Sequence, residues 1–178
     1  MSAAGSRPRI AITLGDPRGV GPEIVAKALA EPLDADVTVI GPADLIPDLP
    51  RITPVGLGAW NSGSGANPED RPRVARAGKL AGHAVERAAA LANEGRVDAI
   101  VTAPLEKHAL HVAGFRYPGH TEWLALLAGG VDVAMMLASG NLRVVLVTTH
   151  IALRDVPVLL TVDRIVRTGR TTAKGLRD

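Results

Sequence analysis

The strongest constraint on the fold of this chain comes from one segment near its start. There an apolar run is followed directly by a glycine-rich loop and the start of a helix. Residues 9–14 read Arg-Ile-Ala-Ile-Thr-Leu, and the following loop, 15–21, has glycines at positions 15, 19 and 21. Pro22 and Glu23 then open a helix, because proline suits the first helical position and an acidic side chain stabilises the first turn. A strand, a tight loop and a helix in this order indicate an α/β protein with a parallel sheet.

The apolar pattern of the rest of the chain extends this unit. We expect further strands over 37–40, 52–55 and 97–102, and helices over 22–30, 74–93, 104–113 and 122–127. Strands over 133–138 and 142–148 flank Ser139-Gly140-Asn141, which is typical of a hairpin. Thr121 and Thr161 are expected to cap the helices that follow them. Residues 49–73, rich in Pro, Gly, Asn and Ser, are expected to form a long surface connection.

The composition agrees with this class of fold. Hydrophobic residues make up 47% of the chain but aromatic residues only 2%, so Ala, Val, Leu and Ile must build the interior. We therefore expect an α/β protein with an open sheet that is largely parallel, an antiparallel hairpin, and helices on both faces of the sheet. A sub-lobe boundary is expected near 103–120.

Charge and cysteine content exclude several classes of function. Lys and Arg total 20 against 18 Asp and Glu, and the charges are dispersed, so we expect no nucleic-acid partner. The chain has no cysteine, which excludes disulfides and thiolate catalysis. No apolar run reaches the roughly 18 residues of a membrane span, and residues 1–9 lack the apolar stretch of a signal peptide. We expect a soluble, cytoplasmic protein.

The glycine loop has two interpretations of about equal weight. Its glycine spacing is not that of the dinucleotide fingerprint G-x-G-x-x-G, but backbone N–H groups at a helix start can still bind an anion. Alternatively, the turn needs glycine for backbone reasons alone. Arg18 in this loop can pair with Asp16 or approach a bound phosphate.

Two histidines are the strongest site candidates. His120 follows Gly119 and precedes Thr121, and a histidine held at a helix start can hydrogen-bond a substrate oxygen. His150 follows the run 143–147, which looks buried, so it is expected at a strand end and is the best metal-ligand candidate. Both histidines are expected to face one cleft, because their loops should open on one side of the sheet.

Other polar residues are weaker candidates. Lys107 lies just after the strand 97–102, although a solvated lysine is the commoner case. His108 and His111 share one helix face, but no acidic or cysteine residue completes a metal set near them. We expect solvent or packing roles for both, and for His83.

Four segments together resemble the 4-hydroxythreonine-4-phosphate dehydrogenase (PdxA) family. Residues 15–23 are similar to its opening Gly-Asp-Pro-Ala-Gly-Ile-Gly-Pro-Glu, with Arg18 in place of alanine and Val20 in place of isoleucine. Residues 102–107 are similar to its Thr-x-Pro-x-x-Lys element, with Glu106 where Asn often stands. The runs 117–122 and 148–155 complete the resemblance, which covers about 10–177.

The resemblance implies an isocitrate/isopropylmalate dehydrogenase-like fold and a homodimer acting in pyridoxal phosphate biosynthesis. It implies oxidation and decarboxylation of 4-phosphohydroxy-L-threonine to 3-amino-2-oxopropyl phosphate, with NAD or NADP and a divalent metal (Zn, Mg, Mn or Co). By resemblance, His120 and Thr121 bind substrate and His150 is the first of three metal-binding histidines. Asp16 and Lys107 are weaker site candidates. Neither catalytic nor nicotinamide-binding residues are assigned.

Alternatives remain open at this point. The family's Asn-Pro-His and His-Asp-Gln elements do not occur in the chain, which resembles only the N-terminal portion of a family member. We therefore expect the chain alone to be truncated and inactive or nearly so. There are three alternatives. The substrate could be a related compound such as threonate 4-phosphate, or the chain could be a non-catalytic fragment that binds a ligand or partner. The weakest alternative is a His-metal hydrolase.

Overall fold

The computed structural model describes residues 7–61, 70–117 and 119–177 and divides the chain into two compact units. The first unit is Met1–Ala128 and the second is Gly129–Asp178. The division falls later in the chain than the stretch 103–120, where the sequence indicates a sub-lobe boundary. Part of the expected surface connection, 62–69, lies outside the described residues.

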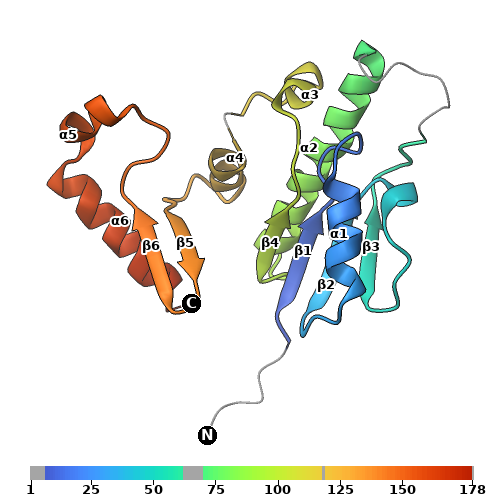
Figure 1. Ribbon diagram of the computed structural model, residues 1–178, viewed down its shortest axis with the longest axis horizontal. Coiled ribbons are helices and arrows are strands. Elements are labelled where there is room, and N and C mark those ends of the chain that lie inside the picture. Colours follow the sequence, from blue (N-terminus) through green and yellow to red (C-terminus); the bar gives the residue numbers. More distant parts are fainter. Residues whose placement is uncertain (1–6, 62–69, 118, 178) are drawn as a thin grey trace, which may run out of the picture. The chain divides into compact units, whose positions relative to one another are not determined.

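The first unit is built on a four-stranded parallel sheet with the order β3-β2-β1-β4 (Figure 1). The strands are β1 (Arg9–Thr13), β2 (Asp36–Gly41), β3 (Ile52–Gly56) and β4 (Ala99–Thr102). A short 3-10 helix, η1 (Ala43–Leu45), follows β2. The expected parallel sheet is confirmed.

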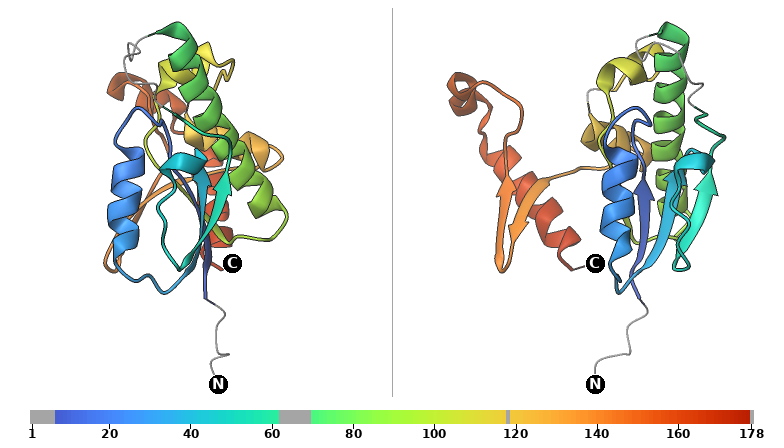
Figure 2. Two further views of the ribbon diagram at one scale, coloured as in Figure 1. Left: turned by 90° about the vertical axis from the view of Figure 1, so that its right-hand side faces the viewer. Right: turned by 45° about the vertical axis from the view of Figure 1, so that its right-hand side comes forward.

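Helices cover both faces of this sheet, as Figure 2 shows for α1 (Gly21–Ala30) and α2 (Arg71–Asn93). Successive side chains of a strand point to opposite faces. Ala11 of β1 is therefore buried in one cluster with Ala84 of α2, whereas Ile12 is buried in another with Val25 of α1. The α/β class and the two-sided covering predicted from sequence are both confirmed.

Two shorter helices follow β4 and pack on α2. They are α3 (Lys107–Val112) and α4 (His120–Leu127). Trp123 of α4 is only 1% exposed and shares a buried cluster with Val85 of α2 and Leu110 of α3. This indole is the main apolar anchor of α4.

The prediction that Thr121 caps this helix is wrong. The N-cap is Gly119, whose carbonyl oxygen accepts a hydrogen bond from the Trp123 backbone N–H at 3.2 Å. The N-cap therefore lies two residues earlier than the predicted cap at Thr121. Thr121 is instead an exposed residue of the first helical turn. Glycine is tolerated at an N-cap, so the helix can begin before Thr121.

The second unit consists of a hairpin and helices. Strands β5 (Met135–Ser139) and β6 (Leu142–Leu146) pair antiparallel, which confirms the predicted hairpin, but they form a sheet of their own. They are followed by η2 (Leu153–Asp155), α5 (Val156–Leu159) and α6 (Val162–Gly175). The Thr161 side chain accepts a hydrogen bond from the Arg164 N–H at 3.2 Å, which confirms the predicted cap of α6.

The run 143–147 is not buried, contrary to its apolar appearance. Among the described residues 129–177 none is buried, and Leu142 of β6 is 65% exposed. A two-stranded ribbon covers little of its own surface, so an apolar sequence alone does not make such a strand buried. Separately, no helix in the described ranges combines the length and apolar character needed to cross a bilayer.

Candidate ligand-binding site

The strand order creates a crevice at one edge of the parallel sheet. Strands β2 and β3 lie on one side of β1, and β4 lies on the other. Ligands of open α/β sheets bind outside the carboxyl ends of the strands where the order reverses in this way. A hollow of about 480 Å³ lies there, and we call it the edge crevice; it is lined by Asp16, Arg18, Gly19, Val20, Pro104, Leu105 and Glu106.

Close backbone contacts explain two of the three loop glycines. Gly15 has a φ of +69°, and a Cβ at this residue would lie 2.1 Å from the Pro104 carbonyl oxygen. A Cβ on Gly21 would lie 2.1 Å from the Leu14 carbonyl oxygen. Of the two interpretations of this loop, the backbone requirement therefore holds at Gly15 and Gly21. Gly19, whose Cβ would meet Asp16 only at 3.5 Å, has no such requirement.

Arg18 joins the two loops of the edge crevice. Its Nε donates to Asp16 Oδ1 at 3.1 Å and its Nη2 donates to Asp16 Oδ2 at 2.8 Å. Nη2 also donates to Oε2 of Glu106, which follows β4. Hydrogen bonding to Asp16 raises the pKa of Arg18 above its ordinary value, against the opposing effect of burial, so the guanidinium is charged. Arg18 and Glu106, both departures from the family pattern, thus contact each other.

A second, smaller hollow adjoins the edge crevice and shares Leu105 with it. We call it the His120 pocket; it has a volume of about 80 Å³ and is lined by Leu105, Lys107, Leu110, Tyr117, Gly119, His120 and Trp123. The Tyr117 and Trp123 rings stack with centroids 4.6 Å apart and planes 11° from parallel. One wall of the pocket is therefore aromatic.

Two polar atoms of residues lining this pocket have no partner among the described residues. They are His120 Nε2 and Trp123 Nε1, both of which are buried. Burial lowers the pKa of His120 below its ordinary value of 6.5, so the imidazole is neutral at neutral pH. A buried polar atom without a hydrogen bond costs free energy, and an oxygen atom of a ligand reaching this pocket could satisfy it.

The structure thus brings Lys107 and His120 together as lining residues of one pocket and places Asp16 in the neighbouring crevice. Thr121 is exposed in the first turn of α4 and does not line either hollow. Sequence reasoning did not select Glu106 or Trp123 as site residues. Trp123 stands three positions after His120, on the same helix face, and this spacing is the sequence signal that could have identified it.

His150 lies in the second unit, in the loop after β6, and is exposed. Its φ is +58°, a left-handed conformation that is uncommon for a residue with a side chain. Within the described ranges no group of three or more His, Asp or Glu residues could hold a metal ion. His150 is therefore a single candidate ligand, and the cleft that it was expected to share with His120 stays a prediction.

The other three histidines were expected to have solvent-exposed or packing roles. His83, His108 and His111 are exposed, and the His83 ring meets the Phe115 ring edge-on with centroids 5.8 Å apart.

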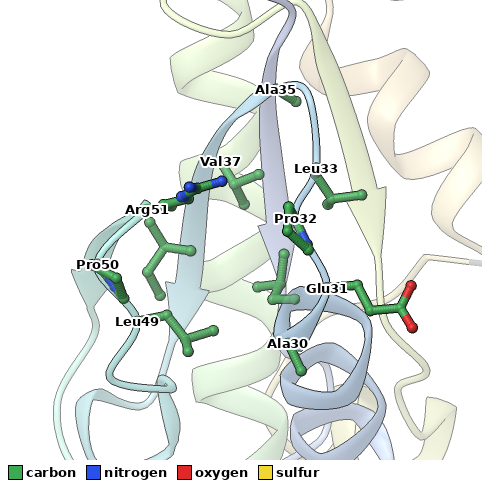
Figure 3. A pocket seen from close by; sticks show the side chains of 11 residues that line it. Ala30, Glu31, Pro32, Leu33, Ala35, Val37, Leu49, Pro50 and Arg51 are labelled. Atoms are coloured by element: carbon green, nitrogen blue, oxygen red, sulfur yellow. The ribbon is translucent and has the colours of Figure 1, made fainter.

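A further hollow, of about 170 Å³, lies beside the starts of β2 and β3 (Figure 3). Its lining is mostly apolar and includes Leu33, Val37 and Leu49, while the Glu31 carboxylate points away from the other labelled side chains. It lies at the amino ends of the strands, away from the carboxyl edge where ligands of this fold bind.

The fold and the two adjoining hollows, the edge crevice and the His120 pocket, are those of an α/β protein with a candidate ligand site at the carboxyl edge of its sheet. The model of the family described as "Pyridoxal phosphate biosynthetic protein PdxA" matches residues 70–178. The chain belongs to this family.

Individual relatives agree with this assignment. The chain is 43% identical to the 4-hydroxythreonine-4-phosphate dehydrogenase of Geobacter metallireducens over 96% of this chain and 57% of that protein. It is 45% identical to the D-threonate 4-phosphate dehydrogenase of Salmonella typhimurium over 82% of this chain and 51% of that protein. The chain thus spans little more than half the length of these relatives.

A solved structure shows the same fold. The crystal structure of 4-hydroxythreonine-4-phosphate dehydrogenase from Klebsiella pneumoniae matches 98% of this chain and 60% of its own chain, with 38% sequence identity and a TM-score of 0.82. The architecture described above is therefore that of this family.

Proposed function

We propose that this protein is an NAD-dependent dehydrogenase of a phosphorylated hydroxy acid, with 4-phosphohydroxy-L-threonine as its substrate. The observation that carries the proposal is the His120 pocket, in which a neutral imidazole and the Lys107 side chain line a hollow beside the edge crevice. The names of the relatives support the same class of reaction.

The residues of the pocket suit a substrate of this kind. A neutral imidazole has one ring nitrogen that donates and one that accepts, so His120 can hold a substrate hydroxyl or carbonyl oxygen. The Lys107 ammonium can pair with an anionic group of the same ligand. Thr121, in the turn that holds His120, is the second proposed substrate-binding residue.

The proposed reaction is the oxidation of a secondary alcohol. The carbinol carbon loses a hydride and the hydroxyl oxygen loses a proton, which leaves a ketone. The resulting β-keto acid loses carbon dioxide and yields 3-amino-2-oxopropyl phosphate. NAD, or alternatively NADP, supplies the hydride acceptor. The step that this chain's own residues carry is the positioning of the alcohol oxygen by His120.

A divalent metal (Zn, Mg, Mn or Co) is part of the proposal, with His150 as one ligand. The described residues supply no further ligand set, so no step is assigned to the metal. Titrating zinc or manganese into the wild type, His150→Ala and the control His111→Ala tests this role. We expect only His150→Ala to bind the metal more weakly. Equal binding by all three proteins would show that His150 is not a metal ligand.

The second candidate substrate is D-threonate 4-phosphate. It is favoured by the 45% identity to the Salmonella typhimurium enzyme named for that compound. The ratio of the two kcat/KM values decides between the substrates. Binding of either compound without formation of NADH would instead favour a non-catalytic, ligand-binding role.

We also propose that the protein forms a homodimer. Apolar side chains such as Leu137, Leu142 and Val162 are more than half exposed in the second unit, and such exposed apolar surface commonly marks an interface between proteins. Sedimentation velocity should show a species of twice the chain mass.

The experiment that tests the dehydrogenase is NADH formation from each substrate with NAD and each metal. We expect His120→Ala to lower kcat/KM by at least about tenfold, while His111→Ala leaves it unchanged. Because this chain alone is expected to be inactive or nearly so, rates typical of enzymes, roughly 1–1,000 per second, would contradict that expectation. Equal losses in both variants would contradict the role of His120.

A further inference from the structure

We propose that Arg18 is an anion-binding residue of the edge crevice, and that Glu106 is an internal counter-ion that the phosphate-type group of a ligand displaces. The proposal rests on the contacts of the guanidinium, on the unequal environments of its two carboxylate partners, and on the crevice that all three residues line.

The guanidinium of Arg18 has more N–H donors than its hydrogen bonds to Asp16 and Glu106 use. An arginine side chain carries five N–H donors in a planar fork. Nε and Nη2 donate to Asp16, and Nη2 donates also to Glu106. Within the described part of the chain Nη1 makes no hydrogen bond, while the residue itself lines the crevice. Part of the fork is thus free to take another acceptor.

The two carboxylates differ in how firmly they are held. The Asp16 side chain is 6% exposed, contacts Arg18 at two points, and also accepts the Arg18 backbone N–H at 2.8 Å. The Glu106 side chain is 51% exposed and contacts only Nη2. An exposed carboxylate regains its hydration when it turns away, so Glu106 can leave at little cost, whereas Asp16 cannot.

Displacement of Glu106 changes the charge that the ligand meets. With Glu106 in place, two carboxylates surround one guanidinium, and the local net charge is negative. With Glu106 turned into solvent, Arg18 and Asp16 balance each other, and the Nη2 donor that Glu106 held becomes available beside Nη1. A phosphate-type oxyanion can then accept two hydrogen bonds from the arginine fork, the geometry that arginine favours for such ligands.

The position of Arg18 in the fold supports an anionic ligand. Arg18 stands at the carboxyl edge of β1, shortly before α1, whose 10 residues begin at Gly21. The N-terminus of a helix favours negative charge. The crevice volume of about 480 Å³ leaves room for a phosphate ester or a pyrophosphate.

Two sources can supply this chemistry: the phosphate ester of a substrate and the pyrophosphate of NAD. The inference goes beyond the proposed dehydrogenase function and shares with it only the class of ligand. Direct binding measurements therefore test it whether or not the protein reduces NAD.

The test is isothermal titration of inorganic phosphate, 4-phosphohydroxy-L-threonine and NAD into the wild type, Glu106→Gln and Arg18→Ala. The control is Glu94→Gln, because Glu94 is also exposed and also pairs with arginine, but lies at the end of α2. We expect Glu106→Gln to bind at least one of these anions about threefold to tenfold more tightly, and Arg18→Ala to bind it at least about tenfold more weakly.

The outcomes separate the sources and the alternatives. Tighter binding of phosphate and the phosphorylated substrate by Glu106→Gln assigns Arg18 to the substrate, and tighter binding of NAD alone assigns it to the cofactor. Unchanged or weaker binding of all three by Glu106→Gln would overturn the inference and leave the ion pair a structural link. If Arg18→Ala does not fold, Glu106→Ala serves as the second variant and is expected to tighten binding as Glu106→Gln does.

Discussion

Gly78 of α2 lies so close to Ala109 of α3 that a Cβ on residue 78 would be 1.9 Å from the Ala109 carbonyl oxygen. The backbones of the two helices are therefore in direct contact, which holds α3, including its first residue Lys107, against α2. One residue without a side chain thus helps to position the His120 pocket, because Lys107 and Leu110 of α3 line it.

Replacement of Gly78 should destabilise the protein. Alanine normally favours a helix by about 1 kcal/mol over glycine, but here its methyl group has no space. We expect Gly78→Ala to lower the free energy of unfolding by about 1–3 kcal/mol in urea denaturation. The matched control is Gly169→Ala in α6, where nothing lies within 4 Å of the added Cβ. The control should show a stabilisation of up to about 1 kcal/mol.

The Asp16–Arg18 contact should be the most important ion pair of the first unit. Both side chains are largely shielded from water, at 6% and 12% exposure, so a carboxylate lost there leaves charged donors unpaired. We expect Asp16→Asn to lower the free energy of unfolding by about 1.5–3 kcal/mol. Glu23→Gln, which breaks an exposed pair with Lys27, should change it by less than about 0.5 kcal/mol. Equal effects of the two substitutions would contradict the shielded role of Asp16.

His120 should make the free energy of unfolding decrease as the solution becomes more acidic. Its pKa is lowered by burial, so below its ordinary value of 6.5 the unfolded chain binds a proton that the folded chain resists. The free energy of unfolding should therefore fall as pH drops from about 6.5 to the folded pKa, and His120→Gln should reduce this slope. Imidazole NMR titration of the folded protein checks the same point. A His120 midpoint at or above 6.5 would contradict the burial argument.

Sequence patterns were sufficient for the first unit's sheet and its two covering helices. The continuous apolar run in β1 and the Ala-rich helical spacing in α2 are local signals, and they agree with the packing of Ala11 and Ile12 on opposite faces. Local signals did not predict the start of α4, because tertiary packing determines where that helix begins. Burial of Trp123 accompanies an α4 that begins at His120 rather than after Thr121.

The candidate site was only partly predictable. His120, Lys107 and Asp16 stood out because each follows a strand or starts a helix. The pairing of Arg18 with Glu106 joins residues 88 positions apart and depends on β4 lying beside β1, a strand order that sequence periodicity does not reveal. The apolar run in β6 misled for a related reason, because its burial depends on what covers the hairpin rather than on its own residues.

The most direct test of the account is the dissociation constant of 4-phosphohydroxy-L-threonine, measured by isothermal titration on the wild type, His120→Ala and His111→Ala. His120 lines the His120 pocket, whereas His111 is exposed on α3. We expect His120→Ala to bind the substrate at least about tenfold more weakly, with an unchanged circular dichroism spectrum, while His111→Ala matches the wild type. Equal affinities for all three proteins would contradict it.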